Sequence, residues 1–386
     1  MSAYIPLSVP TLKGNELKYV KECIDTEWVS SAGKYVELFE QKIAEYTGSK
    51  YAVACVNGTA AIQVSLRLAG VKPSDEVIVS TLTFIASVNA ITYNNATPIF
   101  MDADKYYNLD SEKTIEFIKN ETVYKNGFTY NKNTDKKISA ILPVHVWGNA
   151  CWLDELIELC EERNIAVVED ACESLGTFYN DGEFSGKYTG TIGKLGCISF
   201  NGNKIITTGG GGMILTDDKD LSVKAKYLTT QAKDDPIRYV HDEIGYNFRL
   251  TNIQAALGVA QLEQLPTILK RKKEIYEFYQ SAIENIEGLF LSKVPEYADN
   301  NHWLNLLQID SKVYGDNRES LMKRLKEKGI QTRPVWKLNH LQIPYKNYQS
   351  YRIENANSLV EDSLCLPSST NLNEFETNKI MDLLKK

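Results

Sequence analysis

One lysine of this chain stands between two stretches of unusual composition. The segment "SFNGNKIITTGGGG" (residues 199–212) places Lys204 five residues after Ser199 and shortly before four consecutive glycines. An amine in such a place can attack an aldehyde as a nucleophile, or it can be a surface cation beside a tight turn. The glycines alone favour the turn, because they lack the Lys-Ser/Thr of a phosphate loop and the spacing of a dinucleotide motif.

Other groups capable of chemistry lie far from this lysine in the sequence. Asp170 ends the apolar run "IAVVEDA", and a buried carboxylate there needs hydrogen bonds, a proton or a cation such as a nearby Lys or Arg. In "NGTAAIQVSLRLAG", Gly58 permits a tight turn and Thr59 begins a helix, so this turn could bind phosphate or simply cap the helix. Phe84 offers either a flat ring to a ligand or a core side chain.

A lysine, a carboxylate, a phosphate-binding turn and an aromatic ring are together what pyridoxal 5'-phosphate (PLP) requires. The lysine would bond the aldehyde of the cofactor, and the aspartate would keep its ring nitrogen protonated. Lys204 could then also act as the base that moves the α-proton of a bound amino acid. The sequence therefore predicts a PLP site with Lys204 and Asp170 as its catalytic residues.

The elements that must position these groups follow a βαβ rhythm from about residue 50 to 216. The runs "AILPVHV" and "IAVVEDA" are typical of central parallel strands, whose carboxyl ends gather ligands. "CISF" and "GGMILTDD" are expected strands on either side of Lys204. We expect residues 120–137 to form an exposed loop, and Pro266 to separate two helices. These patterns predict an α/β fold.

We expect a large domain over residues 1–274 and a smaller C-terminal α/β domain over 275–386. The net charge of -7 and the scattered basic residues argue against a nucleic-acid partner. No apolar run approaches the roughly 20 residues of a spanning helix, and the N-terminus has no signal-peptide pattern, so we expect a cytoplasmic protein without a membrane partner. Seven irregularly spaced cysteines are expected to be reduced and buried, and no metal site is expected.

Several long motifs resemble one known family. They include "EWVSSAGKYVELFEQKIAEYTGSKYAVACVNGTAAI", "PVHVWGNACWLDELIELCEERNIAVVEDACESLGT", "SFNGNKIITTGGGGM" and "GYNFRLTNIQAALGVAQLEQL", which span most of the chain. The chain is similar to the PLP-dependent nucleotide-sugar aminotransferases of the DegT/DnrJ/EryC1/StrS type. The resemblance implies an aspartate-aminotransferase-like fold (fold type I of PLP enzymes) with a large, mostly parallel central sheet.

The resemblance also implies roles for single residues. Lys204 would bond the cofactor, and Asp170 would pair with its ring nitrogen. A phosphate site would include Ser199 on one side, with Gly58 and Thr59 opposite.

Phe84 occupies the family's ring-stacking position. Asn247 is similar to the asparagine that reaches the phosphate of the neighbouring subunit, which implies a homodimer with shared active sites. The partners implied are a nucleotide sugar and L-glutamate as amino donor. Candidate substrate contacts are Trp28, Ser30, Tyr188, Arg249, Arg333 and His340.

Two positions depart from the commoner family pattern. Glu173 stands where many relatives have His or Gln, and an ionised carboxylate there would repel the phenolic oxygen of the cofactor unless one of them carries a proton. Gly210 stands where many relatives have Glu, which should make the loop more flexible and open space beside Lys204.

Both departures resemble the legionaminic-acid (LegC-like) subgroup, which makes 4-amino-4,6-dideoxy-N-acetylhexosamines. The alternatives are amination at C3, sugar dehydration, and a catalytically silent sugar sensor. Lys204 favours transamination over dehydration, because the related dehydratases have histidine at this position.

Overall fold

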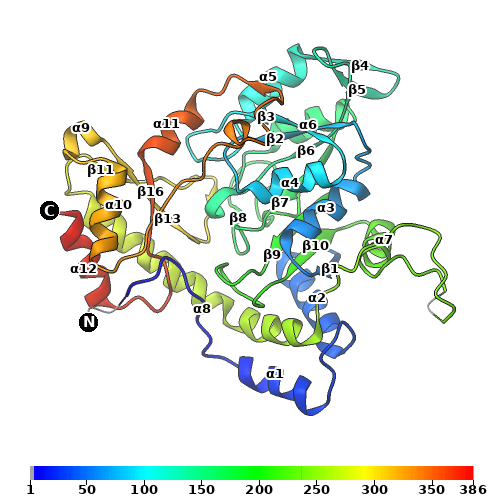
Figure 1. Cartoon of the computed structure of the whole chain (residues 1–386), viewed down its shortest axis with the longest axis horizontal. Helices are drawn as coiled ribbons and strands as arrows, with labels where there is room; N and C mark the ends of the chain where they lie inside the picture. Colours follow the sequence, from blue (N-terminus) through cyan, green and yellow to red (C-terminus); the bar gives the residue numbers. More distant parts are fainter. Residues whose placement is uncertain (1–3, 236, 386) are drawn as a thin grey trace.

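A large twisted sheet forms the centre of the molecule (Figure 1). The computed structural model describes residues 4–235 and 237–385. The strand order in this sheet is β1-β10-β9-β7-β6-β2-β3-β15, with the hairpin β4-β5 attached to β6. The strands are β1 (Tyr51–Cys55), β2 (Glu76–Ser80), β3 (Thr97–Met101), β4 (Thr122–Lys125), β5 (Phe128–Asn131), β6 (Lys137–Leu142), β7 (Ala166–Asp170), β9 (Leu195–Ser199), β10 (Gly212–Thr216) and β15 (Ser350–Tyr351).

The centre of this sheet is parallel, as the sequence predicts. Strands β3, β2, β6, β7 and β9 run in one direction, whereas β10 and β1 are antiparallel to their neighbours. Every residue of β2 and of β10 is buried. The carboxyl ends of β7 and β9 carry Asp170 and Ser199, so the topology brings these two residues to one edge of the sheet.

Helices surround the sheet and extend to the side of the molecule (Figure 1). They are α1 (Glu16–Asp25), α2 (Lys34–Thr47), α3 (Gly58–Leu68), α4 (Ile85–Tyr93), α5 (Ser111–Asn120), α6 (Asp154–Glu162), α7 (Lys219–Thr229), α8 (Asn252–Ile283), α9 (Ser311–Tyr314), α10 (Arg318–Glu327), α11 (Asn355–Asp362) and α12 (Glu374–Leu384), with short 3-10 turns at Val146–Gly148 and Asn339–Leu341.

A smaller antiparallel sheet lies to the left in Figure 1, in the order β11-β13-β16-β14. Its strands are β11 (Leu289–Leu291), β13 (Asn305–Ile309), β14 (Arg333–Pro334) and β16 (Ser363–Leu366), and a separate pair joins β8 (Phe178–Tyr179) to β12 (Ala298–Asp299).

The two expected domains are not separate along the chain. The division expected between residues 274 and 275 falls inside α8, and β15 pairs with β3 of the large sheet. We keep that division as a proposal, with α8 common to both parts.

The sequence prediction at Pro266 is wrong, because α8 continues through it from Asn252 to Ile283. Proline inside a helix costs about 3 kcal/mol, but packing of a long helix can outweigh this cost. Buried residues of α8 occur on both sides of the proline, from Ala255 to Ile283, and the helix packs against α1, α2 and β11.

The loop predicted over residues 120–137 contains a β-hairpin, β4 and β5. Its turn is Asn126–Gly127, and both residues have positive φ (54° and 80°). Asn-Gly favours the tight turns that match the twist of two antiparallel strands. That dipeptide is the signal that the loop prediction missed.

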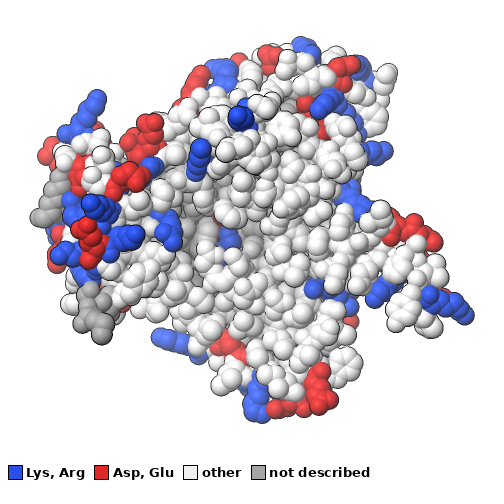
Figure 2. All heavy atoms as spheres, viewed as in Figure 1, with Lys and Arg blue, Asp and Glu red and all other residues white. Residues whose placement is uncertain are grey.

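All seven cysteines are free thiols; six are buried, and Cys172 is half-buried, as expected. No helix of the described residues is long and apolar enough to cross a bilayer. Within residues 4–235 and 237–385, His, Cys, Asp and Glu form no cluster that could hold a metal ion. On the face shown in Figure 2, charges of both signs mix around the periphery and the centre is mostly uncharged.

Candidate active site

A cavity of about 290 Å³ opens where the carboxyl ends of β7 and β9 meet the first turns of α3 and α4. This size is close to the lower end for small-molecule sites, about 300 Å³. Segments far apart in the sequence contribute its walls. The residues that line it are Asn57, Gly58, Thr59, Ile62, Thr83, Phe84, Ala86, Ser87, Val144, Asp170, Cys172, Glu173, Ser199, Asn201, Asn203, Lys204, Trp303 and Trp336.

Asp170 is buried in this cavity wall and is held by neutral donors. The hydroxyl of Ser87, on α4, donates to Oδ2 over 2.6 Å, and the N–H of Cys172 donates to Oδ1 over 3.0 Å. No Lys, Arg or His of the described residues forms an ion pair with it. The sequence suggested a nearby Lys or Arg as the partner of Asp170. None of the described Lys or Arg residues forms this ion pair. A buried carboxylate in this state favours a cationic ligand group.

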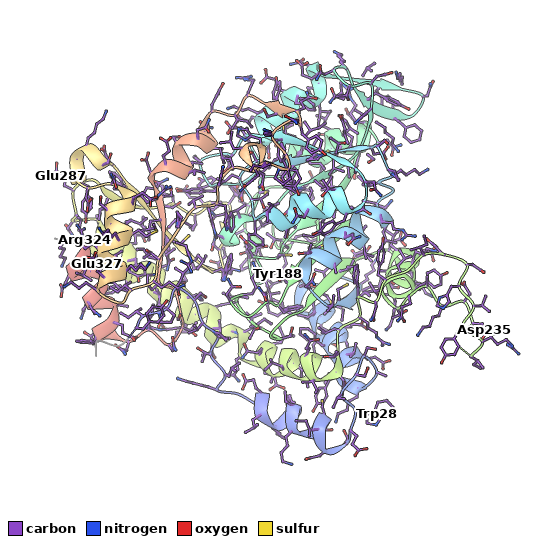
Figure 3. The ribbon with its side chains drawn as sticks, viewed as in Figure 1. Trp28, Tyr188, Asp235, Glu287, Arg324 and Glu327 are labelled. Carbon is purple, nitrogen blue, oxygen red and sulfur yellow. The ribbon has the colours of Figure 1, made fainter. Side chains whose placement is uncertain are left out.

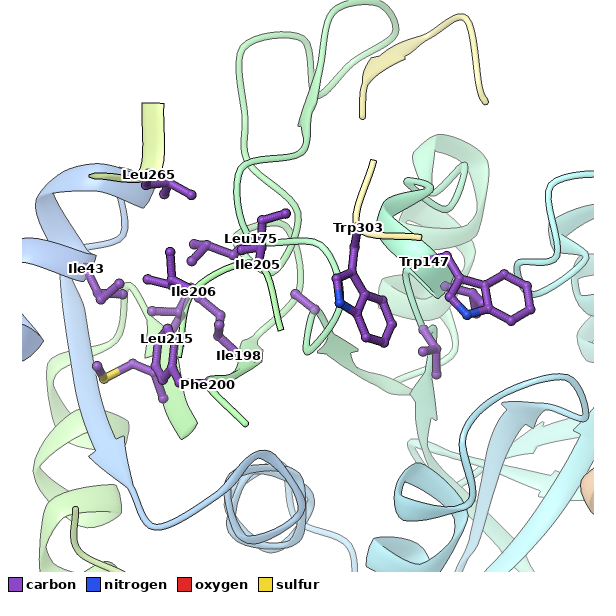
Figure 4. Packing of buried hydrophobic residues seen from close by; sticks show 14 of the residues in the cluster. Ile43, Trp147, Leu175, Ile198, Phe200, Ile205, Ile206, Leu215, Leu265 and Trp303 are labelled. Atoms are coloured by element: carbon purple, nitrogen blue, oxygen red, sulfur yellow. The ribbon is translucent and has the colours of Figure 1, made fainter. Parts of the chain in front are cut away.

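The amine of Lys204 faces two different neighbours. Its Nζ lies 3.3 Å from Oε1 of Glu173 and 4.0 Å from the ring centroid of Trp303. The next residues, Ile205 and Ile206, belong to the apolar core in Figure 4 and anchor this segment. The amine of Lys204 thus lies at the cavity wall, while the backbone of this residue is anchored by the apolar core.

Glu173 is buried, and the N–H of Trp147 donates to its Oε2 over 2.9 Å. Burial raises the pKa of Glu173, although the nearby ammonium of Lys204 and the N–H of Trp147 oppose this effect. A raised pKa favours the protonated form, which can donate a hydrogen bond to an anionic oxygen. A protonated Glu173 would not repel the phenolic oxygen of the cofactor.

The first turn of α3 has the features of an anion site. Asn57 caps the helix by accepting from the N–H of Ala60 over 2.8 Å. The N–H groups of Gly58 and Thr59 precede it in the turn, where helical N–H groups lack partners inside the helix. Ser199 lies directly opposite: a Cβ added to Gly58 would come within 2.9 Å of the Cβ of Ser199.

Gly58 is needed here for close packing and not for a tight turn, since it is the first residue of the helix. An added Cβ would also lie 2.7 Å from Sγ of Cys172. Gly212, the last of the four glycines, packs in the same way, because its Cβ would lie 2.5 Å from the backbone of Asn57. Two of the glycines that frame the site therefore allow β10, α3 and β9 to approach one another.

Gly210 does not line the cavity. Its carbonyl accepts from Nε2 of Gln254 over 2.6 Å and from the hydroxyl of Thr208 over 2.7 Å. Two side chains therefore hold this carbonyl, and the expected flexibility of the loop stays a prediction. An added Cβ would meet only Gln254, at 3.7 Å, so there is room for a side chain.

Phe84 lies at the cavity and is 51% exposed, so it is not a core residue. Its ring packs at 6.0 Å from that of Trp336, which in turn stacks on Trp147 at 4.7 Å. Phe84 and Trp336 line the cavity, and Trp147 packs against Trp336. An exposed ring in this position can cover one face of a flat ligand.

Asn247 does not line the cavity of its own chain. It is exposed and pairs with Thr230 in the segment between α7 and α8. The backbone of Arg249, two residues further on, forms an isolated antiparallel β-bridge with Cys55 at the end of β1. Arg249 is also outside the cavity lining.

The other predicted substrate residues also lie outside the lining of the cavity. Trp28 and Ser30 sit in a loop whose carbonyls accept from Asn252, and Trp28 lies at the edge of the molecule (Figure 3). Tyr188 packs its ring against those of Tyr46 and Phe178.

Arg333 is exposed on β14. His340 shares a hydrogen bond of 2.7 Å with Thr81, and burial lowers its pKa. The structure therefore brings together seven predicted cofactor residues but none of the six predicted substrate residues.

Of the eighteen lining residues, eleven are not predicted from the sequence, and these include Asn57, Ser87, Trp303 and Trp336. Asn57 had a signal, since asparagine before an apolar helical run is a common N-cap. Ser87 is one of many serines, and the two tryptophans come from distant segments, so no local pattern singles them out.

The chemistry of this cavity fits PLP. The unpaired carboxylate of Asp170 suits a protonated ring nitrogen, the amine of Lys204 suits an aldehyde, and the turn at Gly58 and Thr59 suits a phosphate. Each group of the ligand has a chemically matched partner in one cavity.

Comparison with known proteins gives the same class. The model of the DegT/DnrJ/EryC1/StrS aminotransferase family matches residues 10–385. The GDP-perosamine synthase of Escherichia coli O157:H7 is 39% identical over 384 residues, covering 99% of this chain and 98% of that protein. The corresponding synthase of Caulobacter vibrioides is 37% identical over 383 residues, covering 98% and 97%.

Among solved structures, that of DesI with its TDP-sugar product has a TM-score of 0.88 at 25% identity and covers 100% of this chain and 93% of that one. The fold and the site thus define an aminotransferase that depends on PLP. The chain belongs to the DegT/DnrJ/EryC1/StrS aminotransferase family.

The raised pKa of Glu173 predicts how its contribution to stability changes with pH. The folded protein without PLP holds a proton on Glu173 above pH 4.5, the ordinary value at which the unfolded chain loses it. The stabilisation that Glu173 contributes is therefore complete below pH 4.5. It is lost as the pH rises through the higher pKa of Glu173 in the folded protein. Glu173→Gln mimics the protonated form and does not titrate. Urea unfolding of both proteins at several pH values should show the wild type losing stability relative to the variant as pH rises. The raised pKa is contradicted if the difference in unfolding free energy between the two proteins does not change with pH, or if the wild type gains stability relative to the variant as pH rises.

Proposed function

We propose that this protein transfers an amino group from L-glutamate to the C4 ketone of a nucleotide-linked 4-keto-6-deoxy-hexosamine, carried on UDP or GDP. The product is a 4-amino-4,6-dideoxy sugar nucleotide for bacterial glycan synthesis. The observation that carries the proposal is a cavity lined by both the Lys204 amine and a buried Asp170 without a cationic partner among the described residues. The similarity to GDP-perosamine synthases and to DesI, solved with a TDP-sugar product, supports a nucleotide sugar as acceptor.

The residues of the cavity divide the work of a two-step transfer. When bound, PLP supplies an aldehyde that takes up the amino group and a ring that accepts the electrons left by the α-proton. Asp170 holds a proton at the ring nitrogen, and Ser87 orients its carboxylate. Lys204 removes the α-proton of the donor and, in the second half-reaction, delivers a proton to C4 of the sugar. Glu173, with its raised pKa, donates to the phenolic oxygen.

Phosphate and ring are held by the remaining groups. The N–H groups and hydroxyl at Gly58 and Thr59, with the hydroxyl of Ser199, bind the phosphate, and Phe84 covers one face of the ring. Arg249 and Arg333 are candidates for the carboxylate of the donor or the diphosphate of the sugar, with contacts from Trp28, Ser30, Tyr188 and His340.

The site is completed by a second copy of the chain. Asn247 is exposed and is absent from the lining of its own cavity, so it is free to reach the phosphate in the neighbouring subunit. The same segment exposes the large apolar side chains of Ile237, Tyr239 and Ile244, which a homodimer would cover.

More specifically, we assign the product to the legionaminic-acid route. Glu173 and Gly210 support it, because the resemblance to that subgroup rests on these two positions. We assign the reaction to the cytoplasm, where the seven free thiols would remain reduced.

A panel of nucleotide sugars tests the reaction directly. The protein, loaded with PLP, is incubated with L-glutamate and with 3-keto and 4-keto sugars on UDP and GDP, and products are identified by NMR. We expect nitrogen at C4 of a 6-deoxy-hexosamine and an equivalent amount of 2-oxoglutarate. Lys204→Ala should lower the rate by at least about 10³-fold, because the covalent step and the proton transfer both depend on that amine.

Lys194→Ala is the matched control, since Lys194 is exposed at the opposite end of β9 and should keep full activity. Nitrogen at C3, or loss of water without nitrogen, would replace the proposal by C3 amination or dehydration. No change in any sugar by the PLP-loaded protein would favour the silent sensor.

Shared sites predict recovery of activity in hybrid dimers. Lys204→Ala and Asn247→Asp are each expected to be nearly inactive, the second because a carboxylate repels the phosphate. A hybrid of one subunit of each would contain one intact site, with about half of the wild-type activity. Co-expression with two affinity tags isolates this hybrid.

A hybrid of Lys204→Ala with Asp170→Asn is the control and should stay inactive, because both residues serve the same subunit's site. Lack of recovery in the first hybrid would contradict the role of Asn247 across the interface.

A further inference from the structure

Lys272 is a lysine buried in the middle of α8, with a relative exposure of only 4%. Its ammonium donates to the carbonyl of Trp303 over 2.9 Å, to the hydroxyl of Ser368 over 3.0 Å, and also to the carbonyl of Ser368. No carboxylate of the described residues pairs with it. All three acceptors are therefore neutral, and two of them belong to the main chain.

Such an ammonium is costly to bury. Desolvation lowers the pKa of Lys272 to about 7, because burial disfavours the charged form of the amine. An apolar side chain of similar length would fill the same volume at less cost. The reason for a lysine must then lie in the groups that it holds.

The group of interest is Trp303, which lines the cofactor cavity. Its ring centroid lies 4.0 Å from Nζ of Lys204, and its indole N–H donates to the carbonyl of Asn203, the residue before that lysine, over 2.6 Å. The hydroxyl of Ser368 also donates to the carbonyl of Trp303, over 2.9 Å. Two hydrogen bonds thus fix the backbone of Trp303 from α8 and from the segment after β16, and one fixes its ring beside Lys204.

Further hydrogen bonds, made by Asn301, hold the segment that carries Trp303. Asn301, two residues earlier, donates to the carbonyls of Glu173 and Leu175, and its side-chain oxygen accepts from the N–H of Trp303. In Figure 4 the rings of Trp303 and Trp147 lie next to each other at one end of the apolar cluster. Trp303 is therefore held at its carbonyl by Lys272 and Ser368 and at its indole N–H by Asn203.

We propose that Lys272 is a positioning residue for transamination: it holds the Trp303 ring against the nitrogen of Lys204, whose charged neighbour is Glu173 at 3.3 Å. The proposal rests on the proposed role of Lys204. The face of an indole stabilises a nearby positive charge, and this effect falls away as the ring moves off. Lys272 acts on the reaction through Trp303, without touching the ligand.

The test uses Lys272→Met in the full-length protein, with Lys273→Met as control. Lys273 is the next residue on the same helix, but its side chain is about half exposed and its nearest partner is Asp299 at 3.9 Å. The measurement is the pH midpoint at which the visible absorbance of the PLP-loaded protein changes. We expect Lys272→Met to move this midpoint down by about half a pH unit, because loss of the indole contact favours the neutral nitrogen. Lys273→Met should leave it unchanged.

A double-mutant cycle shows whether the effect passes through Trp303. Trp303→Leu removes the aromatic face beside Lys204, and in this background Lys272→Met should add no further shift. Tryptophan fluorescence of the PLP-free protein gives a second signal, and its emission should differ between wild type and Lys272→Met but not between wild type and Lys273→Met. Should Lys272→Met fail to fold, Ser368→Ala removes one acceptor and one bond to Trp303 and should give a smaller shift of the same sign.

The outcomes separate the inference from the proposed function. If the midpoint is unchanged in Lys272→Met, or if the shifts of the two substitutions simply add, Lys272 contributes to stability alone and the inference is overturned. If Lys204→Ala keeps the visible absorbance of the wild type, the role of Lys204 fails first. If that absorbance depends on Lys204 and the midpoint moves only with Lys272, both stand.

Discussion

Asp170 carries a carboxylate into a buried position, and the rest of the site is organised around it. Its two oxygens accept from Ser87 and from the N–H of Cys172, which orient the group without neutralising a full charge. A buried anion of this kind is stable when a cationic group of a ligand completes its environment. The parallel strand β7 delivers Asp170 to the edge of the sheet where α3 and α4 begin, so the carboxylate and the anion-binding turn open into one cavity.

The other charged residues adjust to that arrangement. Lys204 lies between Glu173 and the ring of Trp303, so its nitrogen has an acid on one side and an aromatic face on the other. Glu173 remains compatible with an anionic oxygen because burial raises its pKa. Trp303 is in turn hydrogen-bonded to Lys272 of α8, so the position of one ring at the cavity depends on a contact from a different part of the chain.

The strands of the large sheet and the cofactor half of the site could be predicted, because β-branched runs mark the strands and their polar ends mark the sheet edge. Asp170 is predicted in this way, Gly58 and Thr59 from the helix start that follows β1, and the phosphate role of Ser199 from the resemblance to a family. Pro266 was misjudged because a local cost was weighed without the burial of α8 on both sides. Trp303 and Trp336 could not be found, since only tertiary contacts bring segments that far apart to the cavity. The six substrate candidates lie outside the cavity lining.

The attachment of PLP to Lys204 is tested most directly by chemical trapping. The PLP-loaded protein is reduced with sodium borohydride, digested, and its peptides are sequenced by mass spectrometry. The structure predicts one pyridoxyl group per chain, on the peptide that contains Lys204, and loss of this label in Lys204→Ala. A label on another lysine, or no label on a protein that still transfers amino groups, would contradict the account.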